Sequence, residues 1–391
     1  MIEGADDLTY FLERQVTKMP NEFASMLRHR FASRLLIGML AAICGLTPAA
    51  AALHFVAIQE VFVGPPSDMI NPNLTADQKA QYVMLRMTSA GQTSVSGATI
   101  RVEDAAGNIL GNFGTFAANL GNGGAACAYP NCPAFVIGTT AAKNLFTFNF
   151  EKLVDGQAGR VALPVSGGRA CWRSAASVYD CVAWGNFSCT AANCPGGANA
   201  LHLGDVNGNG CDTNFDGPAT ATGLQFGKSL TRSAFVCGVK VNSTQFALQF
   251  PKLVNNLGTN DNVDSDADGL INRLDCNQAN SSIQWAPVEV QHLTVSGQPA
   301  STDSWDSQSA FVGTGVAYDE IRGSLSLVSN FTDDSCNSPG TASTSSVDAS
   351  VPLADAGFYY LVRATGGTGC VGTYGKSSTG VSRDPQLTAC P

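Results

Sequence analysis

Charged side chains and histidines are scarce in this chain of 391 residues. Only 14% of the residues are Asp, Glu, Lys or Arg, and His occurs four times, whereas about a quarter of an average soluble domain is charged. The formal net charge is −9, so no basic surface is expected and nucleic acid is not an expected partner. This composition is typical of a secreted β protein with neutral polar surfaces and many turns.

Several catalytic motifs are also missing. The chain has no G-x-S-x-G, P-loop or H-E-x-x-H pattern, and its serines lack an ordered His/Asp partner set. We therefore expect no enzyme activity. The alternative is an extracellular hydrolase with its site in the loops between 110 and 240, which predicts a deep pocket with two or more converging titratable groups.

Only one apolar run stands out, and it lies near the N-terminus. Arg28, Arg30 and Arg34 precede twelve apolar residues (35–46), and Ala49 to Ala51 offer an A-x-A cleavage site. These three features predict a secretory signal peptide over 26–52. Residues 1–25 are then an extension in front of the true start at Met26. The run is too short for an ordinary membrane span, so the mature chain has none; a retained N-terminal anchor is the alternative.

Cysteine is the one reactive residue type that is plentiful. Apart from Cys44, twelve cysteines remain, and an even number in an exported protein predicts six disulfides. The spacing suggests local pairs at Cys127/Cys132, Cys171/Cys181 and Cys189/Cys194, and leaves Cys211/Cys237 and a set of Cys276, Cys336, Cys370 and Cys390. The alternative is a metal cluster, but paired C-x-x-C units are lacking.

Short alternating runs dominate the first segment, residues 53–255. Strand-like runs lie at 55–63, 81–87, 98–104, 144–150 and 244–250. Period-two alternation with one apolar face predicts strands, and Asp104 to Asn108 predict a hairpin turn in which Gly107 takes a positive φ. Short helical turns are expected only at 76–81 and 140–145. Many short strands separated by turns predict a β-sandwich or barrel.

The order of these runs resembles a known family. The stretches AIQEVFVG, AQYVMLRM and VSGATIRVEDAAGNILGNFGTF, followed by GGRACW, YDCVAWGNF and NSTQFALQFPKLVNNLG, are similar to bacterial lamin-tail-like domains, which are immunoglobulin-like sandwiches. Met84 departs from the pattern, because many relatives carry Glu there. The resemblance implies binding or scaffolding and no catalysis.

The third segment, residues 285–391, has strand runs at 288–295, 323–330 and 358–364. Its stretches WAPVEVQHLTVS and GFYYLVRATGG resemble a fibronectin type III-like β-sandwich found at the ends of bacterial exported proteins. The linker between the segments, 256–284, is rich in Asp and Asn with almost no core-forming residues. The expected fold is all-β, with two immunoglobulin-like β-sandwich domains joined by a calcium-binding linker.

The linker contains a twelve-residue pattern for a calcium loop. Asp264, Asp266, Asp268, Asn272 and Asp275 occupy positions 1, 3, 5, 9 and 12, Gly269 occupies position 6, and Leu270 offers its backbone carbonyl at position 7. Alternating residues in a tight loop turn their oxygens to one centre, as Ca²⁺ requires. The closing Asp, followed by Cys276, resembles a thrombospondin type 3 calcium repeat. The alternative is an acidic, solvated linker without metal.

A weaker copy lies upstream. Asp205, Asn207, Asn209, Cys211, Thr213 and Asp216 fit positions 1, 3, 5, 7, 9 and 12. Only two of them are carboxylates, so a Gly/Asn loop without metal is the favoured interpretation.

Four residues outside these loops are of types that also occur in functional sites. His54, His202 and His292 lack metal-ligand spacing and are expected at the surface or in the core. Trp172 is expected in the core, packed on a disulfide, rather than as an exposed sugar-stacking platform. Together the patterns predict a secreted, calcium-binding, non-enzymatic protein that binds a surface polymer or another protein outside the cell; a structural envelope component is the further alternative.

Overall fold

Antiparallel strands supply nearly all of the regular structure, and the expected all-β fold is confirmed. The computed structural model describes residues 56–88, 91–120, 131–175, 178–188, 223–233, 245–254, 262–377, 379–384 and 390. Within them, helix is limited to α3 (Pro66–Met69), α4 (Thr140–Phe146), α6 (Ser309–Val312) and the 3-10 turn η2 (Leu325–Leu327). None of these helices is long and apolar enough to cross a membrane.

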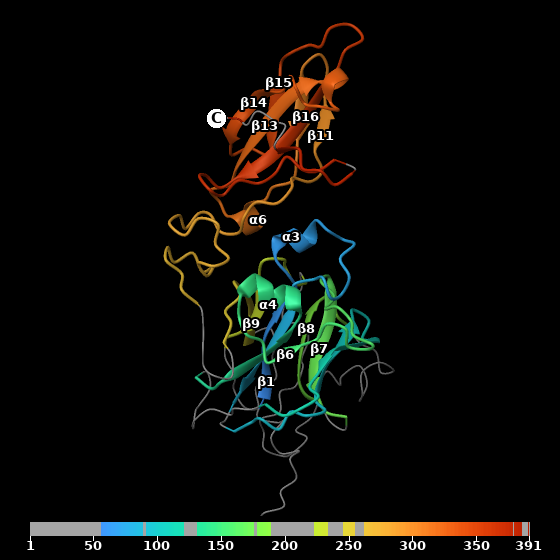
Figure 1. The fold of residues 1–391 in the computed structure, drawn as a ribbon, viewed down its shortest axis with the longest axis vertical. Helices are drawn as coiled ribbons and strands as arrows, with labels where there is room; N and C mark the ends of the chain where they lie inside the picture. Colours follow the sequence, from blue (N-terminus) through green and yellow to red (C-terminus); the bar gives the residue numbers. More distant parts are fainter. Residues whose placement is uncertain are drawn as a thin grey trace, which may run out of the picture. The chain divides into compact units, whose positions relative to one another are not determined.

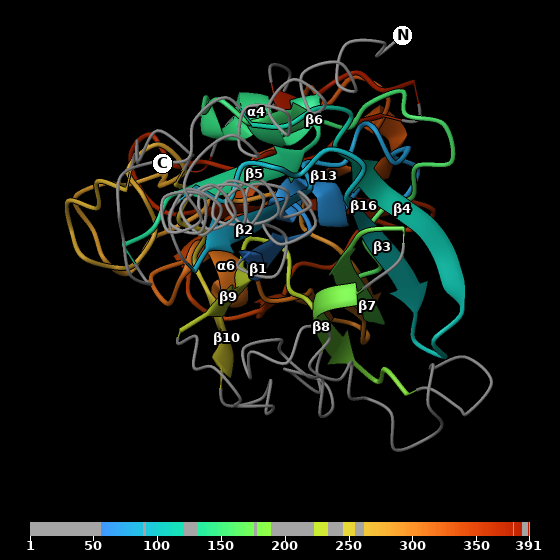
Figure 2. The same ribbon diagram turned by 90° about the horizontal axis from the view of Figure 1, so that it is seen from below.

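The strands before residue 250 form a six-stranded and a four-stranded sheet. The six-stranded sheet has the order β10 (Phe246–Gln249), β9 (Ser229–Arg232), β1 (Val56–Phe62), β2 (Tyr82–Met87), β5 (Ala134–Gly138) and β6 (Lys152–Leu153). The four-stranded sheet has the order β4 (Ile109–Thr115), β3 (Thr99–Asp104), β7 (Gly167–Arg173) and β8 (Val178–Gly185). Figure 2 shows β10, β9, β1, β2 and β5 in sequence across the larger sheet.

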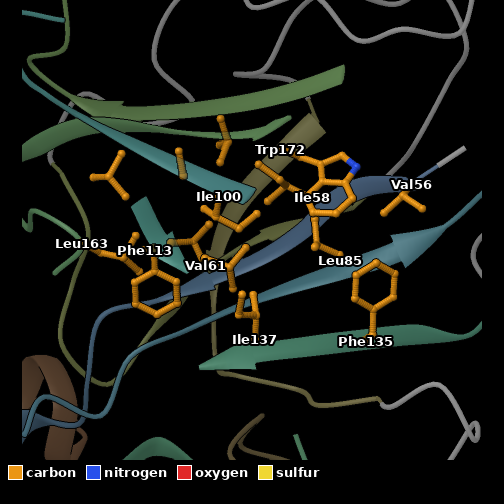
Figure 3. Packing of buried hydrophobic residues seen from close by; sticks show 14 of the residues in the cluster. Val56, Ile58, Val61, Leu85, Ile100, Phe113, Phe135, Ile137, Leu163 and Trp172 are labelled. Atoms are coloured by element: carbon orange, nitrogen blue, oxygen red, sulfur yellow. The ribbon is translucent and has the colours of Figure 1, made fainter. Parts of the chain in front are cut away.

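The main core lies between these two sheets. Ile58, Leu85 and Ile137 of the larger sheet pack with Ile100 and Trp172 of the smaller one, and all are fully buried (Figure 3). Trp172 is therefore a core residue, as predicted. However, Cys171 lies in a separate cluster with Cys181, because successive residues of a strand point to opposite faces. The disulfide and the indole thus lie on opposite faces of β7, contrary to the expected packing of one on the other.

The predicted hairpin between β3 and β4 is confirmed. The Asp104 Oδ1 atom accepts hydrogen bonds from the backbone N–H groups of Ala106 and Asn108, both at 2.9 Å. Gly107 takes a φ of 81°, which a residue without a Cβ adopts at low cost. The turn residues therefore determine this connection locally.

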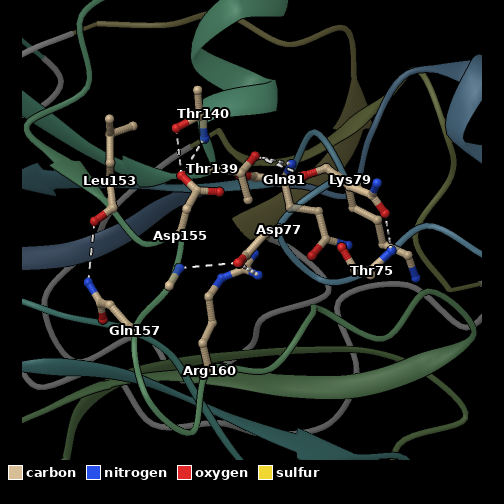
Figure 4. A network of polar contacts seen from close by, with 12 residues as sticks. Thr75, Asp77, Lys79, Gln81, Thr139, Thr140, Leu153, Asp155, Gln157 and Arg160 are labelled. Atoms are coloured by element: carbon tan, nitrogen blue, oxygen red, sulfur yellow. Dashed lines mark hydrogen bonds and ion pairs between the residues drawn. The ribbon is translucent and has the colours of Figure 1, made fainter.

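A second cluster covers the opposite face of the six-stranded sheet. Phe62 and Tyr82 pack there against Phe146 of α4. Thr139 caps this helix by accepting from the N–H of Ala142 at 3.0 Å, and Asp155 accepts from both the N–H and the hydroxyl of Thr140 (Figure 4). Because both faces are covered, every residue of β1 is buried.

The same network ties the 75–81 turn to the 152–160 loop. Arg160 forms an ion pair with Asp77 at 2.6 Å (Figure 4). Gln81, fully buried, accepts from the N–H of Leu163 at 2.9 Å. These contacts fix the edge of the sheet beside α4.

Two three-stranded sheets form the C-terminal part. One has the order β11 (Thr294–Ser296), β12 (Ser301–Ser304) and β15 (Ser345–Asp348), and the other has the order β14 (Ser335–Thr341), β13 (Ala317–Ser324) and β16 (Phe358–Thr365) (Figure 1). Ile321 and Leu361 pack with Tyr374 and Cys390 on one face of the second sheet. Their neighbours Glu320 and Val362 therefore point to its other face.

Four local expectations differ from the structure. The strand predicted over 288–295 is limited to β11, with an isolated bridge at Glu289 before it. Residues 144–150 were predicted as a strand, but helix α4 extends to Phe146, because the Thr139 cap stabilises a helix there. The predicted strand 323–330 ends at Ser324 and continues as η2. Residues 76–78 form a turn rather than a helix.

The 256–284 segment contributes to the core, contrary to the composition-based expectation. Leu270, Ile271, Leu274 and Ile283 are buried in the same cluster as Tyr82 and Phe146. The Trp285 indole N–H donates to the carbonyl of Gly227 at 2.9 Å. A few well-spaced apolar residues therefore anchor a segment that is otherwise rich in Asp and Asn.

Three disulfides lie among the described residues. Cys171 pairs with Cys181, as the spacing predicted, and Cys276–Cys370 and Cys336–Cys390 pair the remaining set within itself. Cys132 is also disulfide-bonded. The expected partners Cys127, Cys189, Cys194, Cys211 and Cys237 lie outside the described residues.

Candidate metal centre

The 264–275 loop is folded around Asp264. Its Oδ1 atom accepts from the N–H of Ala267 at 2.8 Å, and its Oδ2 atom accepts from the N–H of Gly269 at 2.9 Å. Ala267 and Gly269 have φ values of 62° and 99°, so the chain makes the sharp turn that position 6 of a calcium loop requires. The Asp and Gly spacing seen in the sequence thus produces the expected backbone.

Three carboxylates converge inside this loop. One oxygen atom from each of Asp264, Asp266 and Asp268 lies within 4.8 Å of the other two. All three residues are half-buried. Like charges at this separation repel unless a cation or protons compensate them.

The fourth predicted carboxylate, Asp275, is nearly buried. Its side chain is only 7% exposed, and its Oδ1 atom accepts from the N–H of Asn277 at 2.8 Å. Its Oδ2 atom has no hydrogen-bond donor among the described residues, and neither do the Oδ2 atoms of Asp266 and Asp268. A buried carboxylate oxygen without a donor is costly, so these atoms need a positive partner.

The pKa values of Asp275 and Asp268 also indicate that these carboxylates lack a positively charged partner. Burial raises the pKa of Asp275 to about 6, and the charges of Asp268, Asp266 and Asp264 add to this effect. The pKa of Asp268 is also raised, first by burial and then by Asp266 and Asp264. The charges of Asp264 and Asp266 therefore act on both Asp268 and Asp275.

The remaining predicted ligands support the loop. The Asn272 Oδ1 atom accepts from the N–H of Ser265 at 2.8 Å, and its Nδ2 atom donates to the Ser265 hydroxyl at 2.7 Å. The Leu270 N–H donates to Asp268 at 2.7 Å, while the Leu270 side chain is fully buried. Asn272 closes the loop and Leu270 anchors it to the core.

The donor set fits calcium. Asp264, Asp266 and Asp268 supply hard oxygen atoms to one centre, and the described loop brings no His nitrogen or Cys sulfur there. Asp275 is not part of this converging group, but it is near enough for their charges to raise its pKa. Oxygen-only sets of this kind suit Ca²⁺, which takes six to eight oxygens and tolerates irregular geometry. Asp264, Asp266, Asp268 and Asp275 would hold the ion.

Several other predicted residues lie outside the described parts of the chain. These are the weaker loop with Asp205, Asn207, Asn209, Cys211, Thr213 and Asp216, and also His54, His202 and most of the 110–240 loops considered for a hydrolase. His292 is described: its imidazole is at the surface and lies 2.7 Å from Asp306, so it is a surface histidine.

Sequence reasoning missed a second acidic group, which lies on the strands of the two C-terminal sheets. Asp303, Glu320 and Asp348 are all buried, on β12, β13 and β15. Asp348 pairs with Arg322 at 2.7 Å, while both Asp303 carboxyl oxygens lack a donor among the described residues. The three residues are distant in sequence, so only strand alternation around each could have indicated that they face one interior.

Comparisons of the chain with protein-family models, with curated proteins and with solved structures find no match.

Proposed function

We propose that this chain is an exported calcium-binding β protein that acts as a binding or adhesion module outside the cell. The observation that carries the proposal is the buried Asp275 oxygen without a donor beside three converging carboxylates. A divalent cation would satisfy these oxygens and remove the repulsion among them. The predicted signal peptide and the disulfides support export.

Calcium would stabilise the loop that precedes the C-terminal sandwich. The loop is followed at once by Cys276, which is bonded to Cys370, and Leu270 and Leu274 are buried in a large apolar cluster. No helix flanks the loop among the described residues, so the paired helices of an EF-hand sensor are not formed there. The ion would therefore hold a structural turn rather than transmit a signal.

Isothermal titration of the intact protein with CaCl₂ tests this proposal. We expect a saturable binding heat that is lost in Asp266→Ala/Asp268→Ala and kept in Asp306→Ala, whose carboxylate is exposed and away from the loop. A second double variant, Asp205→Ala/Asp216→Ala, shows whether the upstream loop adds a site. Absence of binding at millimolar calcium, or equal binding in the Asp266/Asp268 variant and the wild type, contradicts the proposal.

A further inference from the structure

A cavity opens at one end of the C-terminal sandwich. It has a volume of about 660 Å³, within the range of small-molecule sites. The β11–β12 hairpin, the residues after β15 and the start of β16 form its walls, and Val295, Pro299, Ser301, Val351, Phe358 and Tyr360 line it. No lining residue carries a charge.

Two aromatic rings shape one wall of this cavity. Phe358 and Tyr360 are two residues apart on β16 and therefore share one face of the strand. Their ring centroids lie 6.5 Å apart and the ring planes are nearly perpendicular, at 81°. Both residues are half-buried, so part of each ring stays accessible to a ligand.

One ion pair supports both rings. The Arg322 guanidinium lies over the Phe358 ring, 4.5 Å from its centroid, and donates to both carboxylate oxygens of Asp348 at 2.7 and 3.0 Å. The Tyr360 hydroxyl donates to the same carboxylate at 3.0 Å. Neither aromatic side chain can turn away without breaking a contact with this partly buried pair, so the wall is preorganised.

The polar groups of the cavity are hydroxyls. The Ser301 hydroxyl donates to the Tyr360 oxygen at 3.0 Å, which leaves the Ser301 oxygen able to accept. Ser350 adds a third hydroxyl. Hydroxyl groups both donate and accept, whereas a charged ligand would lose its hydration here without gaining a countercharge.

These features together point to a sugar. A pyranose ring has apolar C–H faces, which suit an aromatic surface, and a rim of hydroxyls, which suit partners that donate and accept. An added peptide strand is a poorer match, because the adjacent edge strand β11 has only three residues. We propose that this cavity binds an uncharged, pyranose-based glycan. The glycan would be the partner of the binding module, so this inference rests on the binding role in the proposed function.

Binding is tested on the intact protein with four soluble neutral probes: a β-glucan, an arabinoxylan, a galactomannan and a chito-oligosaccharide. Alginate serves as the charged comparison. We expect at least one neutral probe to bind with a Kd below about 10 mM, and alginate to bind at least tenfold more weakly.

Three variants place the binding in the cavity. Phe358→Ala removes the stacking surface, and we expect an affinity loss of at least tenfold. Val351 is 62% exposed, so Val351→Trp fills the cavity without disturbing the core. We expect this variant to abolish binding, and it tests the proposal even if Phe358→Ala fails to fold. Val371→Ala changes an exposed residue that is not part of the lining and should bind as the wild type does.

The proposal is overturned if none of the neutral probes binds, if alginate binds as tightly, or if Val351→Trp binds like the wild type. The same titrations in Asp266→Ala/Asp268→Ala separate the two proposals. Glycan binding that persists there supports the cavity even if the calcium site fails.

Discussion

At the scale of single residues, the most unusual feature is a buried pair of carboxyl groups. Ser346, directly opposite Asp303 in the β12–β15 ladder, donates to the Oε2 atom of Glu320, so Asp303 and Glu320 share a neighbour. The Glu320 Oε1 atom and both Asp303 oxygens lack a donor among the described residues. A protonated Asp303 carboxyl group can donate a hydrogen bond to Glu320. This bond gives a hydrogen-bond partner to most of the carboxyl oxygens named above.

This pair has a defined pH dependence. Burial raises the pKa of Asp303 from 3.8 to about 7, with further contributions from Glu320 and Asp348. The folded state therefore keeps a proton that the unfolded state releases above about pH 4. The contribution of Asp303 to stability is full below that pH and is lost as the pH rises to about 7.

The substitution Asp303→Asn tests this account, because the amide can donate to Glu320 at every pH. We expect the variant to be about 1–3 kcal/mol more stable than the wild type at pH 8, with a much smaller difference at pH 5. Urea unfolding at both pH values measures it. Asp306→Asn, at the surface, is the control. The Asp303→Asn variant and the wild type share the other buried acids, such as Glu60, so the contributions of these acids to the pH dependence of stability cancel in the comparison. A variant that is no more stable than the wild type at pH 8, or that gains the same stability at pH 5 and pH 8, would show that folding does not raise the pKa of Asp303.

At the scale of elements, a buried ion pair closes one side of the N-terminal sandwich. Arg232 of β9 pairs with Asp180 of β8 at 2.6 Å, and both side chains are almost completely buried. The Arg232 Nε atom donates to the carbonyl of Ile58, and the Ile58 N–H donates to Asp180. The three strands β1, β8 and β9 thus meet at one polar centre that joins the two sheets.

Removal of one partner should be costly. We expect Asp180→Ala to lower the free energy of unfolding by about 3–5 kcal/mol, because Arg232 is left buried and charged without a carboxylate partner. Replacing both residues, as Asp180→Leu/Arg232→Met, should recover a large part of this loss. Guanidinium unfolding of the two variants measures the difference.

The exposed pair of His292 and Asp306 provides the matched control for that experiment. Its side chains are 81% and 61% exposed, so Asp306→Ala should change stability by no more than about 1 kcal/mol. The account is contradicted if Asp180→Leu/Arg232→Met is less stable than Asp180→Ala. That result would mean that the loss of stability in Asp180→Ala does not come from the unpaired charge of Arg232.

Most strand positions follow from the sequence, but the burial of polar side chains within the strands does not. The β3–β4 hairpin depends on Asp104 and Gly107, which act within five residues. By contrast, β1 is buried on both faces, so polar residues such as Glu60 lie in the interior. There Glu60 accepts from Tyr82 at 2.5 Å, a contact between two strands that alternation does not reveal.

At the scale of the whole molecule, the 264–275 loop is linked to distant residues. The Cys276–Cys370 disulfide spans 94 positions, and Cys276 directly follows Asp275. The buried loop residue Leu270 belongs to one apolar cluster with Tyr82 and Val362. The loop is therefore embedded among residues from all three predicted segments.

This arrangement predicts a coupling between the disulfide and calcium. Cys276→Ser/Cys370→Ser should lower the free energy of unfolding by about 2–5 kcal/mol and also weaken calcium binding, because Asp275 loses its fixed neighbour. The Cys171–Cys181 disulfide closes a loop of only 10 positions. Cys171→Ser/Cys181→Ser should therefore cost less stability and leave calcium affinity unchanged. Urea unfolding and calcium titration of both variants measure these effects. Equal calcium affinities in the two variants would contradict the coupling.

Local sequence determined the all-β class, the β3–β4 turn and the backbone of the 264–275 loop. Each depends on residues within about a dozen positions of one another, such as Asp264 and Gly269, so spacing alone specifies the geometry. Only the tertiary structure brought together Asp303 with Glu320, Asp180 with Arg232, and Phe358 with Arg322. These contacts arise from strand pairing and sheet packing, in which residues far apart in the chain become neighbours, and no local pattern encodes them.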